Sequence, residues 1–306
     1  MKRHGVAEPR RLGLLRTEGG RAAPRRGRFA YAPGDRIAGD LTVIGHLAVG
    51  RFGHLYQVWS ATEWCALTCK IVAPDRRDER AALAALRREA RILRLVRHPG
   101  IVRSFGGGEH DGLPFLLIEY LDGPSLFDII DNSPDRQLDV DDAVRSAIHI
   151  AAALYHLHRN GFLYLDLKPA NLLLRDGVPV LVDLDAVRRV HDPRRPVRRV
   201  GTAPYMAPEQ VRREPLSRAC DVYGLGALLY EMLTGRWPFE HVYLEEEPAP
   251  DDARQYPQIR GAAPPPLRTI VPGITASLDE TVMRCLAHDP ADRFDSMHPV
   301  LLDLAK

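Results

Sequence analysis

The first part of the chain carries the hydrophobic pattern of a β-sheet. Short segments rich in β-branched and aromatic residues alternate with turn residues, which is typical of strands. We predict five strands, at residues 41–47, 54–60, 66–72, 101–105 and 114–120. Gly106–Gly108 and the Asp111–Gly112 pair are predicted to be turns around the last two strands.

One long helix interrupts these strands, and helices dominate after Gly123. Residues 77–97 place apolar side chains three and four positions apart, so that they share one face of a helix. A second stripe of this kind begins at Val140, and residues 221–233 are almost all apolar, as in a buried helix. The order predicts an α+β fold, with a small β-rich lobe that has one helix and a larger helical lobe.

The composition is that of a soluble globular protein. Of the 306 residues, 45% are hydrophobic and 27% are charged, which argues against a mostly disordered chain. No apolar run approaches the roughly 18–20 residues of a membrane-spanning helix, and Met1–Arg36 lacks the apolar block of a signal peptide. The four cysteines are scattered without a metal-binding pair, so we expect reduced thiols and a cytoplasmic location.

The net charge of +2 hides an asymmetric distribution. Met1–Arg36 contains ten Lys/Arg and three Asp/Glu, so this arm is strongly basic. A basic arm is able to touch nucleic acid or an acidic surface. Because aromatic residues are not interleaved along it, we favour a solvated, disordered arm and expect no nucleic-acid partner. Residues 245–266, rich in Pro, Asp and Glu, are predicted to be a loop or insertion.

Two features of the first lobe suggest phosphate binding, each weakly by itself. Gly50 and Gly53 lie between two predicted strands, where backbone N–H groups are able to approach a phosphate, although most such hairpins are only turns. Lys70, one of only four lysines among 42 basic residues, lies among apolar strand residues. Glu89 on the following helix is a suitable partner for it; the alternative is a lysine that reaches solvent at the sheet edge.

A third constellation is more specific. The segment Tyr164–Asn171 holds Asp166, Lys168 and Asn171, and Asp183-Leu-Asp185 follows the next predicted strand. This arrangement is suited to hold a proton acceptor, a phosphate clamp and a metal ligand around one centre, whereas the alternative is an ordinary polar loop between two strands. Three further strings follow in order: Gly201–Glu209, Asp221–Gly226 and Asp289–Arg293.

Together these strings resemble the eukaryotic-like (Hanks-type) serine/threonine protein kinase family. The resemblance extends from about Asp40 to Leu304. It implies a bilobal α+β kinase domain at residues 37–306, with an N-lobe at about 37–121 and a C-lobe at about 122–306, after the arm at 1–36. It also implies ATP and Mg²⁺ as cofactors, with Mn²⁺ as an alternative ion, and protein substrates with a Ser or Thr acceptor.

The resemblance assigns a role to each matching residue. Asp166 would accept the proton of the substrate hydroxyl, Lys168 would neutralise the transferred phosphoryl group, and Thr202 would brace both. Asn171 and Asp183 would bind Mg²⁺. The residues that would bind the nucleotide are Leu47, Gly50, Gly53, Leu55, Lys70, Glu89, Glu119, Leu121 and Leu173.

Within the nucleotide site, the resemblance distinguishes several parts. The backbone of 50–53 would cover the phosphates, Lys70 paired to Glu89 would hold them, and the backbone of Glu119–Leu121 would bind adenine beside Ile118. A lysine suits such a clamp, because a compact ammonium fits where a planar guanidinium would be misplaced. In the C-lobe, Asp221 would orient the catalytic loop, and Glu209 and Arg293 would form a buried ion pair.

Five positions depart from the family pattern, and none of them removes a catalytic group. They are Ala48, Thr68, Tyr164, Leu165 and Asp185. Asp185 matters most, because it either helps to bind Mg²⁺ or faces solvent, and we expect that it faces solvent. We therefore predict an active kinase, with a pseudokinase scaffold and a small-molecule kinase as alternatives. The oligomeric state is not indicated.

The segment after Asp183 suggests how the protein is regulated. In kinases that loop phosphorylation activates, an arginine pairs with the phosphate, and here that position is Leu165. Between Asp183 and Glu209 the only hydroxyl residues are Thr202 and Tyr205. We therefore predict a loop that needs no phosphate and is ordered by Arg194–Arg199 against acidic groups. The arginines of this segment either favour acidic substrates or only solvate the loop; they are Arg188, Arg189, Arg194, Arg195, Arg198 and Arg199.

Overall fold

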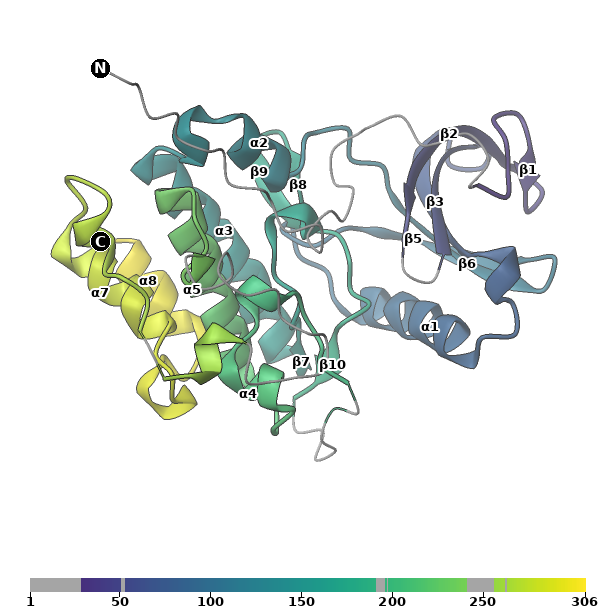
Figure 1. The fold of residues 1–306 in the computed structure, drawn as a ribbon. Coiled ribbons are helices and arrows are strands. Elements are labelled where there is room, and N and C mark those ends of the chain that lie inside the picture. The colour runs from purple at the N-terminus through teal and green to yellow at the C-terminus, as the bar shows by residue number, and fades with distance from the viewer. Residues whose placement is uncertain (1–28, 51–52, 191–195, 197, 241–255, 262) are drawn as a thin grey trace, which may run out of the picture.

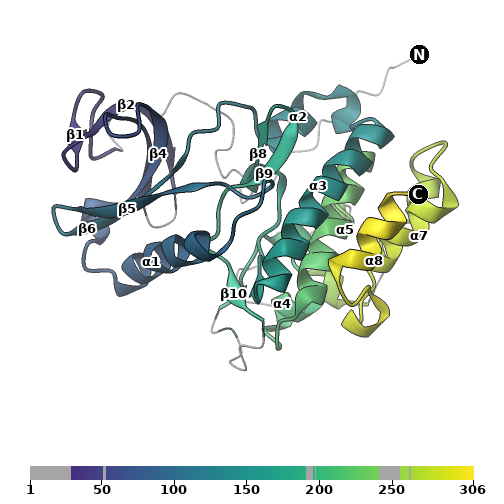
Figure 2. The same ribbon diagram turned by 180° about the vertical axis from the view of Figure 1, so that it is seen from behind.

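The chain folds into two lobes, a β-rich one and a helical one (Figures 1 and 2). The computed structural model describes residues 29–50, 53–190, 196, 198–240, 256–261 and 263–306. The smaller lobe contains a six-stranded sheet and a single long helix, and the larger lobe is mostly helical. The predicted α+β bilobal architecture is therefore confirmed.

The N-lobe sheet is antiparallel, with the strand order β1-β2-β3-β4-β6-β5. Its strands are β1 (Arg36–Ile37), β2 (Leu41–Val49), β3 (Gly53–Ser60), β4 (Cys65–Val72), β5 (Ser104–His110) and β6 (Leu113–Glu119). Helix α1 (Arg80–Leu95) packs on β4, β5 and β6. This helix is shorter than the predicted 77–97, because a separate turn of 3₁₀ helix precedes it and Val96 is extended.

The prediction of a turn at Gly106–Gly108 is wrong, because these glycines lie inside β5. At Gly107, a Cβ atom would come within 2.3 Å of the carbonyl oxygen of Phe115 on β6. Gly106 has a φ of +97° beside an irregularity in the register of the two strands. These glycines therefore allow two strands to approach closely, rather than reversing the chain.

The boundary predicted at residue 36 also needs correction, because the chain packs on the sheet from Phe29 onward. The Phe29 ring stacks on the His46 ring with centroids 4.2 Å apart. The Tyr56 hydroxyl on β3 accepts hydrogen bonds from the N–H groups of Ala30 (3.0 Å) and Tyr31 (3.2 Å). Aromatic side chains and a buried hydroxyl thus hold residues 29–31 against the N-lobe; residues 1–28 of the predicted arm lie outside the described residues.

The C-lobe is built around two long helices that lie side by side in both views (Figures 1 and 2). Its helices are α2 (Leu126–Asn132), α3 (Val140–Arg159), α4 (Pro208–Arg212), α5 (Arg218–Thr234), α7 (Ala276–Cys285) and α8 (Met297–Leu304). Its short strands are β7 (Phe162–Leu163), β8 (Leu172–Arg175), β9 (Val178–Leu181) and β10 (Arg188–Arg189). β7 pairs with β10, and β8 pairs with β9.

Helix α5 is the centre of this lobe, since every residue from Ala219 to Thr234 is buried. Ser217 caps its N-terminus and Gly235, in the left-handed conformation, ends it. Across the described ranges, we find no helix with the length and apolarity that a membrane crossing requires. Of the loop predicted at 245–266, residues 245–255 and 262 lie outside the described residues, and Pro257–Ile259 forms a turn of 3₁₀ helix.

Candidate active site

A cavity of about 1680 Å³ lies between the lobes and brings the predicted site residues together. Both lobes line it: Lys70 and Glu119 come from the sheet, and Asp166, Asn171 and Asp183 from the C-lobe. Of the predicted site residues, only Glu89 is not on its wall, because that side chain is buried behind Lys70. The remaining predicted residues on the wall are Leu47, Gly50, Gly53, Leu55, Leu121, Lys168, Leu173 and Thr202.

The two glycines of the turn at one edge of the cavity have different structural roles. The N–H of Gly50 donates to the carbonyl oxygen of Gly53 at 2.8 Å, which closes the turn between β2 and β3. At Gly53 a Cβ atom would come within 2.1 Å of the Ile71 carbonyl oxygen, so β4 itself excludes a side chain there. Gly53 is therefore needed for strand packing, whatever its part in phosphate binding. Arg51 and Phe52 lie outside the described residues.

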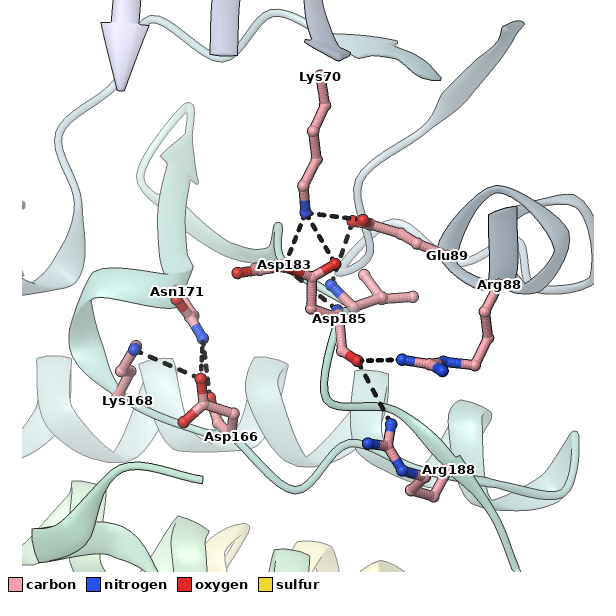
Figure 3. A network of polar contacts seen from close by, with 10 residues as sticks. Lys70, Arg88, Glu89, Asp166, Lys168, Asn171, Asp183, Asp185 and Arg188 are labelled. Carbon is pink, nitrogen blue, oxygen red and sulfur yellow. Dashed lines mark hydrogen bonds and ion pairs between the residues drawn. The ribbon is translucent and has the colours of Figure 1, made fainter. Parts of the chain in front are cut away.

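The ammonium of Lys70 faces three carboxylates (Figure 3). Its Nζ lies 2.7 Å from Glu89 Oε2 and 3.1 Å from both Asp183 Oδ1 and Asp185 Oδ1. Glu89 is fully buried on α1, and its Oε1 accepts the N–H of Leu184 at 3.3 Å. Glu89 thereby joins the sheet, α1 and the Asp183–Asp185 segment, and the predicted Lys70–Glu89 pair is formed.

The expectation that Asp185 faces solvent is wrong. Its carboxylate points into the cluster at Lys70, and its side chain is only 24% exposed. The turn of the segment explains this orientation, since the N–H of Asp185 donates to Asp183 Oδ1 at 3.2 Å and Leu184 between them is fully buried. Asp185 therefore adds a third carboxyl group to the surroundings of Lys70.

These charges shift the pKa values of the cluster in opposite directions. Burial alone lowers the pKa of Lys70, but Asp183, Glu89 and Asp185 together raise it well above its usual value. Burial, with a contribution from Asp185 and Asp183, raises the pKa of Glu89 to about 8 against the opposing effect of Lys70. Burial also opposes ionisation of Asp183, but Lys70 outweighs it and lowers the pKa of that carboxyl. Negative charge is thus in excess at this end of the cavity.

The catalytic loop holds Asp166 in one orientation. Its Oδ1 accepts the hydroxyl of Thr202 at 2.7 Å, and its Oδ2 accepts the amide of Asn171 at 3.1 Å. The ammonium of Lys168 lies 3.4 Å from the same Oδ2. The Asn171 amide also donates to the backbone carbonyl of Asp166 at 2.9 Å. Three predicted residues therefore converge on the predicted base.

Buried groups beneath the loop fix its backbone. Asp221 of α5 accepts the N–H of Tyr164 at 2.8 Å and that of Leu165 at 2.7 Å. Leu165 has a φ of +70°, a left-handed conformation that costs a residue with a Cβ about 1–2 kcal/mol. The Gln210 amide donates to the Leu165 carbonyl oxygen at 2.9 Å. Both sides of the strained residue are thus fixed, and Asp221 has its predicted position.

Tyr164, which departs from the family pattern, is fully buried beside the loop. Within the described part of the chain its hydroxyl has no hydrogen-bond partner. Burial is the main cause that raises its pKa well above the usual value, and nearby carboxylates add to it. Tyr164 therefore stays neutral and supports the loop by packing.

The predicted structural ion pair is also present. Arg293 Nη1 and Nη2 donate to the two oxygens of Glu209 at 2.7 and 3.0 Å, and both residues are buried. Such paired, charge-assisted hydrogen bonds fix geometry as well as charge. The pair ties the end of the Gly201–Glu209 segment to the last part of the chain.

Two arginines, one from α1 and one from β10, hold the backbone of the Asp183–Asp185 segment, and the sequence predicted this role for neither of them. Arg88 Nη2 and Arg188 Nη1 both donate to the backbone carbonyl oxygen of Asp185, at 2.9 and 3.4 Å (Figure 3). Arg188 also donates to the carbonyls of Ala186 and Val187. Arg88 directly precedes Glu89 in the sequence, which was the available signal. Of the predicted loop-ordering arginines, Arg199 donates to the Val211 carbonyl at 2.9 Å, and Arg194 and Arg195 lie outside the described residues.

The residues fit the cofactors that the resemblance implies. Asp183 supplies a carboxylate, and Asn171 uses its amide nitrogen on Asp166, which leaves its amide oxygen for a cation. Carboxylate and amide oxygens are the ligands that Mg²⁺ prefers. The excess negative charge at Lys70 also favours a divalent cation there, and Lys70 and Lys168 offer ammonium groups to phosphates.

Comparison with known proteins agrees with this geometry. A family model described as "Protein kinase domain" matches residues 41–301. Serine/threonine-protein kinase PknB of Mycobacterium tuberculosis is 30% identical over 258 residues, which covers 78% of this chain and 38% of PknB. PknB of Mycolicibacterium smegmatis is 32% identical over 250 residues, again 78% of this chain and 38% of the relative. A probable serine/threonine-protein kinase of Streptomyces coelicolor is 29% identical and covers 98% of this chain and 41% of that protein.

Solved structures show the same fold. The kinase domain of Mycobacterium tuberculosis PknI superposes with a TM-score of 0.69 at 24% identity, covering 90% of this chain and 99% of that one. The chain spans about two fifths of the length of the curated relatives named above. The family match, the motifs and the site geometry agree: the chain belongs to the protein kinase domain family, in its Hanks-type serine/threonine branch.

Proposed function

We propose that the chain is an active serine/threonine protein kinase that transfers the γ-phosphoryl group of ATP to hydroxyl groups of protein substrates. This proposal rests on one observation: the predicted nucleotide-binding residues and the predicted catalytic residues meet in one cavity. Lys70 is paired to Glu89 beside Asp183, and Asp166 is oriented by Thr202, Asn171 and Lys168. A scaffold that only binds a partner needs no such orientation of a proton acceptor.

In this mechanism each residue has a distinct task. Asp166 accepts the proton that the substrate hydroxyl loses as its oxygen bonds to the γ-phosphorus and the bond to the leaving ADP oxygen breaks. Lys168 offsets the charge of the transferred group, and Lys70 holds the remaining phosphates. Mg²⁺, held by Asp183 and Asn171, would supply further charge neutralisation. The bond from Thr202 to Asp166 supports the preference for Ser/Thr over Tyr.

We also propose that the segment between Asp183 and Glu209 needs no phosphate. Leu165 offers no charge to a phosphate, and its carbonyl is held by Gln210 instead. The start of the segment is held to α1 by Arg88 and to itself by Arg188, through the Asp185 carbonyl. These contacts replace the ordering that a loop phosphate provides elsewhere.

Four cysteine thiols without a disulfide support our further proposal of a cytoplasmic location.

One observation favours a second candidate function, a pseudokinase that binds nucleotide without transfer. The Asp185 carboxylate contacts the lysine that would hold the phosphates, and so it competes with them. A small-molecule kinase is less favoured, because the Gly201–Glu209 segment, exposed at Gly201 and buried from Pro204 onward, resembles the platform for protein substrates of the family.

Radiolabelled ATP, supplied with generic protein substrates and with small-molecule pools, separates these functions. Wild type should label protein Ser/Thr residues, and Asp166→Asn should lower the rate by about 10²–10⁴-fold while ATP·Mg²⁺ still binds. Nucleotide binding without transfer under any Mg²⁺ or Mn²⁺ condition would establish the pseudokinase instead. Labelled small molecules with unlabelled protein would establish the third function.

A further inference from the structure

The walls of the cavity carry opposite charges in different parts. Carboxylates come from the end of β6, the segment leading to α2, the first turn of α2, the catalytic loop and the Asp183–Asp185 segment: Glu119, Asp122, Asp128, Asp166, Asp183 and Asp185. Arginines come from α1, β10 and the segment before Gly201: Arg88, Arg91, Arg188, Arg189, Arg198 and Arg199. Glu119 lies in the proposed adenine-binding segment, Asp128 caps α2 with Ser125, and Asp166, Asp183 and Asp185 lie at the proposed metal and phosphate positions, so the arginines are left to meet something else.

Several of these arginines keep an uncompensated positive charge. Arg88 is bound to a neutral carbonyl oxygen, and the Arg189 guanidinium lies over the Phe162 ring, 5.6 Å from its centroid. Arg91 and Arg198 are exposed. Among the residues that the structure describes, no carboxylate lies within 4.0 Å of the guanidinium nitrogens of Arg88, Arg91, Arg189 or Arg198. A neutral partner orients a guanidinium but leaves its charge available to an anion.

Chain connectivity places two of these arginines close to the proposed base. Arg198 is four residues from Thr202, which bonds to Asp166, and four residues span at most about 14 Å. Arg189 is paired in register with Phe162, which is four residues from Asp166 on the other side. These two chain connections therefore limit how far the guanidinium groups of Arg198 and Arg189 lie from Asp166, where the acceptor hydroxyl would bind.

A basic substrate would find little compensation around the same segment. Ala170 on the cavity wall carries no charge. The Glu231 carboxylate beneath the Gly201–Glu209 segment is only 2% exposed, and it accepts the Tyr205 hydroxyl at 2.6 Å and the Trp237 indole N–H at 3.1 Å. That carboxylate is therefore already engaged within the protein.

We infer that the substrate segment around the phosphoacceptor is acidic, carrying carboxylate or phosphorylated side chains that bind to the arginine wall formed by Arg91, Arg189 and Arg198. This inference rests on the proposed function and names its substrate class. The nucleotide end of the cavity repels such anions, so the acidic side chains lie toward α1 and β10, and the acceptor hydroxyl lies at Asp166.

The test uses peptides that share one Thr acceptor and differ only in flanking residues, which are Asp/Glu, phosphoserine, uncharged or Lys/Arg. Binding to the full chain with Asp166→Asn is measured by fluorescence anisotropy, so the measurement does not depend on transfer. We expect at least about tenfold tighter binding of the Asp/Glu or phosphoserine peptide than of the Lys/Arg peptide, and weaker binding at high salt. The ratio between the two anionic peptides identifies the source of the charge.

Charge reversal locates the site. Added to Asp166→Asn, the pair Arg189→Glu and Arg198→Glu should lower the affinity for the acidic peptide by about tenfold or more. The matched control reverses two exposed arginines that do not line the cavity, Arg145→Glu on α3 and Arg284→Glu on α7. It should change the affinity by less than about twofold.

Two outcomes would overturn the inference. One is equal or tighter binding of the Lys/Arg peptide, and the other is an equal loss with the control pair Arg145→Glu and Arg284→Glu, which would indicate attraction by overall charge. Wild-type transfer to the same peptides is measured separately. Preferential binding of the acidic peptide without any transfer would refute the proposed function and leave the arginine wall as a binding site for anionic peptides only.

Discussion

The catalytic loop (Tyr164–Asn171) and the lysine cluster, which consists of Lys70 and the carboxyl groups around it, line the same cavity. The charges of their side chains are balanced in opposite ways. In the catalytic loop and in α5 beneath it, each carboxylate oxygen of Asp166 and Asp221 accepts a hydrogen bond from a donor fixed in the fold. In the lysine cluster, a single ammonium faces Glu89, Asp183 and Asp185. The loop is therefore electrostatically satisfied without a ligand, whereas the cluster carries unbalanced negative charge.

This difference indicates which region changes when the nucleotide binds. A preorganised base needs no rearrangement at the moment of reaction. A cluster with excess carboxylates gains most from a divalent cation and must exchange partners when phosphates reach Lys70. We therefore expect substitutions in the loop to affect transfer, and substitutions in the cluster to affect nucleotide and metal binding.

The largest effect on binding is expected from Asp183→Asn. Removing this carboxylate takes away a proposed metal ligand, so Mg²⁺-dependent ATP binding should weaken by more than about tenfold, or 1.4 kcal/mol. Calorimetric titration with ATP, with and without Mg²⁺, measures the change. Asp166→Asn is the control, since it should bind ATP·Mg²⁺ like wild type. Equal binding by Asp183→Asn and wild type would remove the distinction between the two regions.

A second large effect is expected beneath the catalytic loop. Asp221→Asn leaves at least one buried donor unsatisfied, which costs about 1–3 kcal/mol of unfolding free energy, and releases the strained Leu165, so transfer should also slow. Urea unfolding and transfer rates are measured together. Asp279→Asn is the matched control, because Asp279 is also buried and accepts the Leu267 N–H at 2.7 Å in the far part of the C-lobe. It should lose stability without slowing transfer; slowing by both variants would contradict a specific role for Asp221.

The sequence was sufficient for the fold class and for most of the site. The hydrophobic pattern placed β2, β3, β4, β6 and α1 to within about three residues, whereas the strand predicted at 101–105 lies at Ser104–His110. Motif spacing identified Asp166, Asn171 and Asp183. Local pattern does not report what a side chain meets across the fold. Asp185 was therefore expected in solvent, although the buried Leu184 beside it turns its carboxylate toward Lys70.

The same limit explains two errors in the N-lobe. Gly106–Gly108 has the composition of a turn, and only the close approach of β6 shows why a strand requires glycine there. The basic composition of the arm concealed Phe29 and Tyr31, whose partners His46 and Tyr56 come from other strands. Both features depend on contacts between segments that are distant in the sequence.

A moderate effect is expected from Asp185, and it sharpens the description of the cluster. Asp185→Gly and the shape-preserving Asp185→Asn each remove one carboxylate that competes for Lys70. ATP affinity should rise severalfold, and the transfer rate should change by less than about tenfold, or 1.4 kcal/mol in barrier. A Mg²⁺ titration of both variants tests the alternative role. A sharp rise in the Mg²⁺ requirement would show that Asp185 is a metal ligand.

The smallest effect on activity is expected at Glu231, away from both regions. Burial raises its pKa to about 7, while hydrogen bonds from Tyr205 and Trp237 partly oppose the shift. Between pH 4.5 and 7 the folded protein thus binds more protons than the unfolded chain, so stability should fall as pH rises, by at most about 1.4 kcal/mol per pH unit from this group. Urea unfolding at several pH values should give a flatter profile for Glu231→Gln. If the stability of Glu231→Gln depended on pH as that of wild type does, the attribution of this pH dependence to Glu231 would be wrong.

The most direct test of the preorganised catalytic loop is to remove any phosphate from the protein. Wild type is treated with phosphatase, repurified and compared with untreated protein for its rate of transfer, and mass spectrometry covers residues 183–209. We expect that Gln210 and Asp221 order the catalytic loop, and that Arg88 and Arg188 order the segment after Asp183 through the Asp185 carbonyl. The two rates will then agree, and the peptide covering residues 183–209 will carry no phosphate. A large loss of activity that follows a phosphate between residues 183 and 209 would contradict this conclusion.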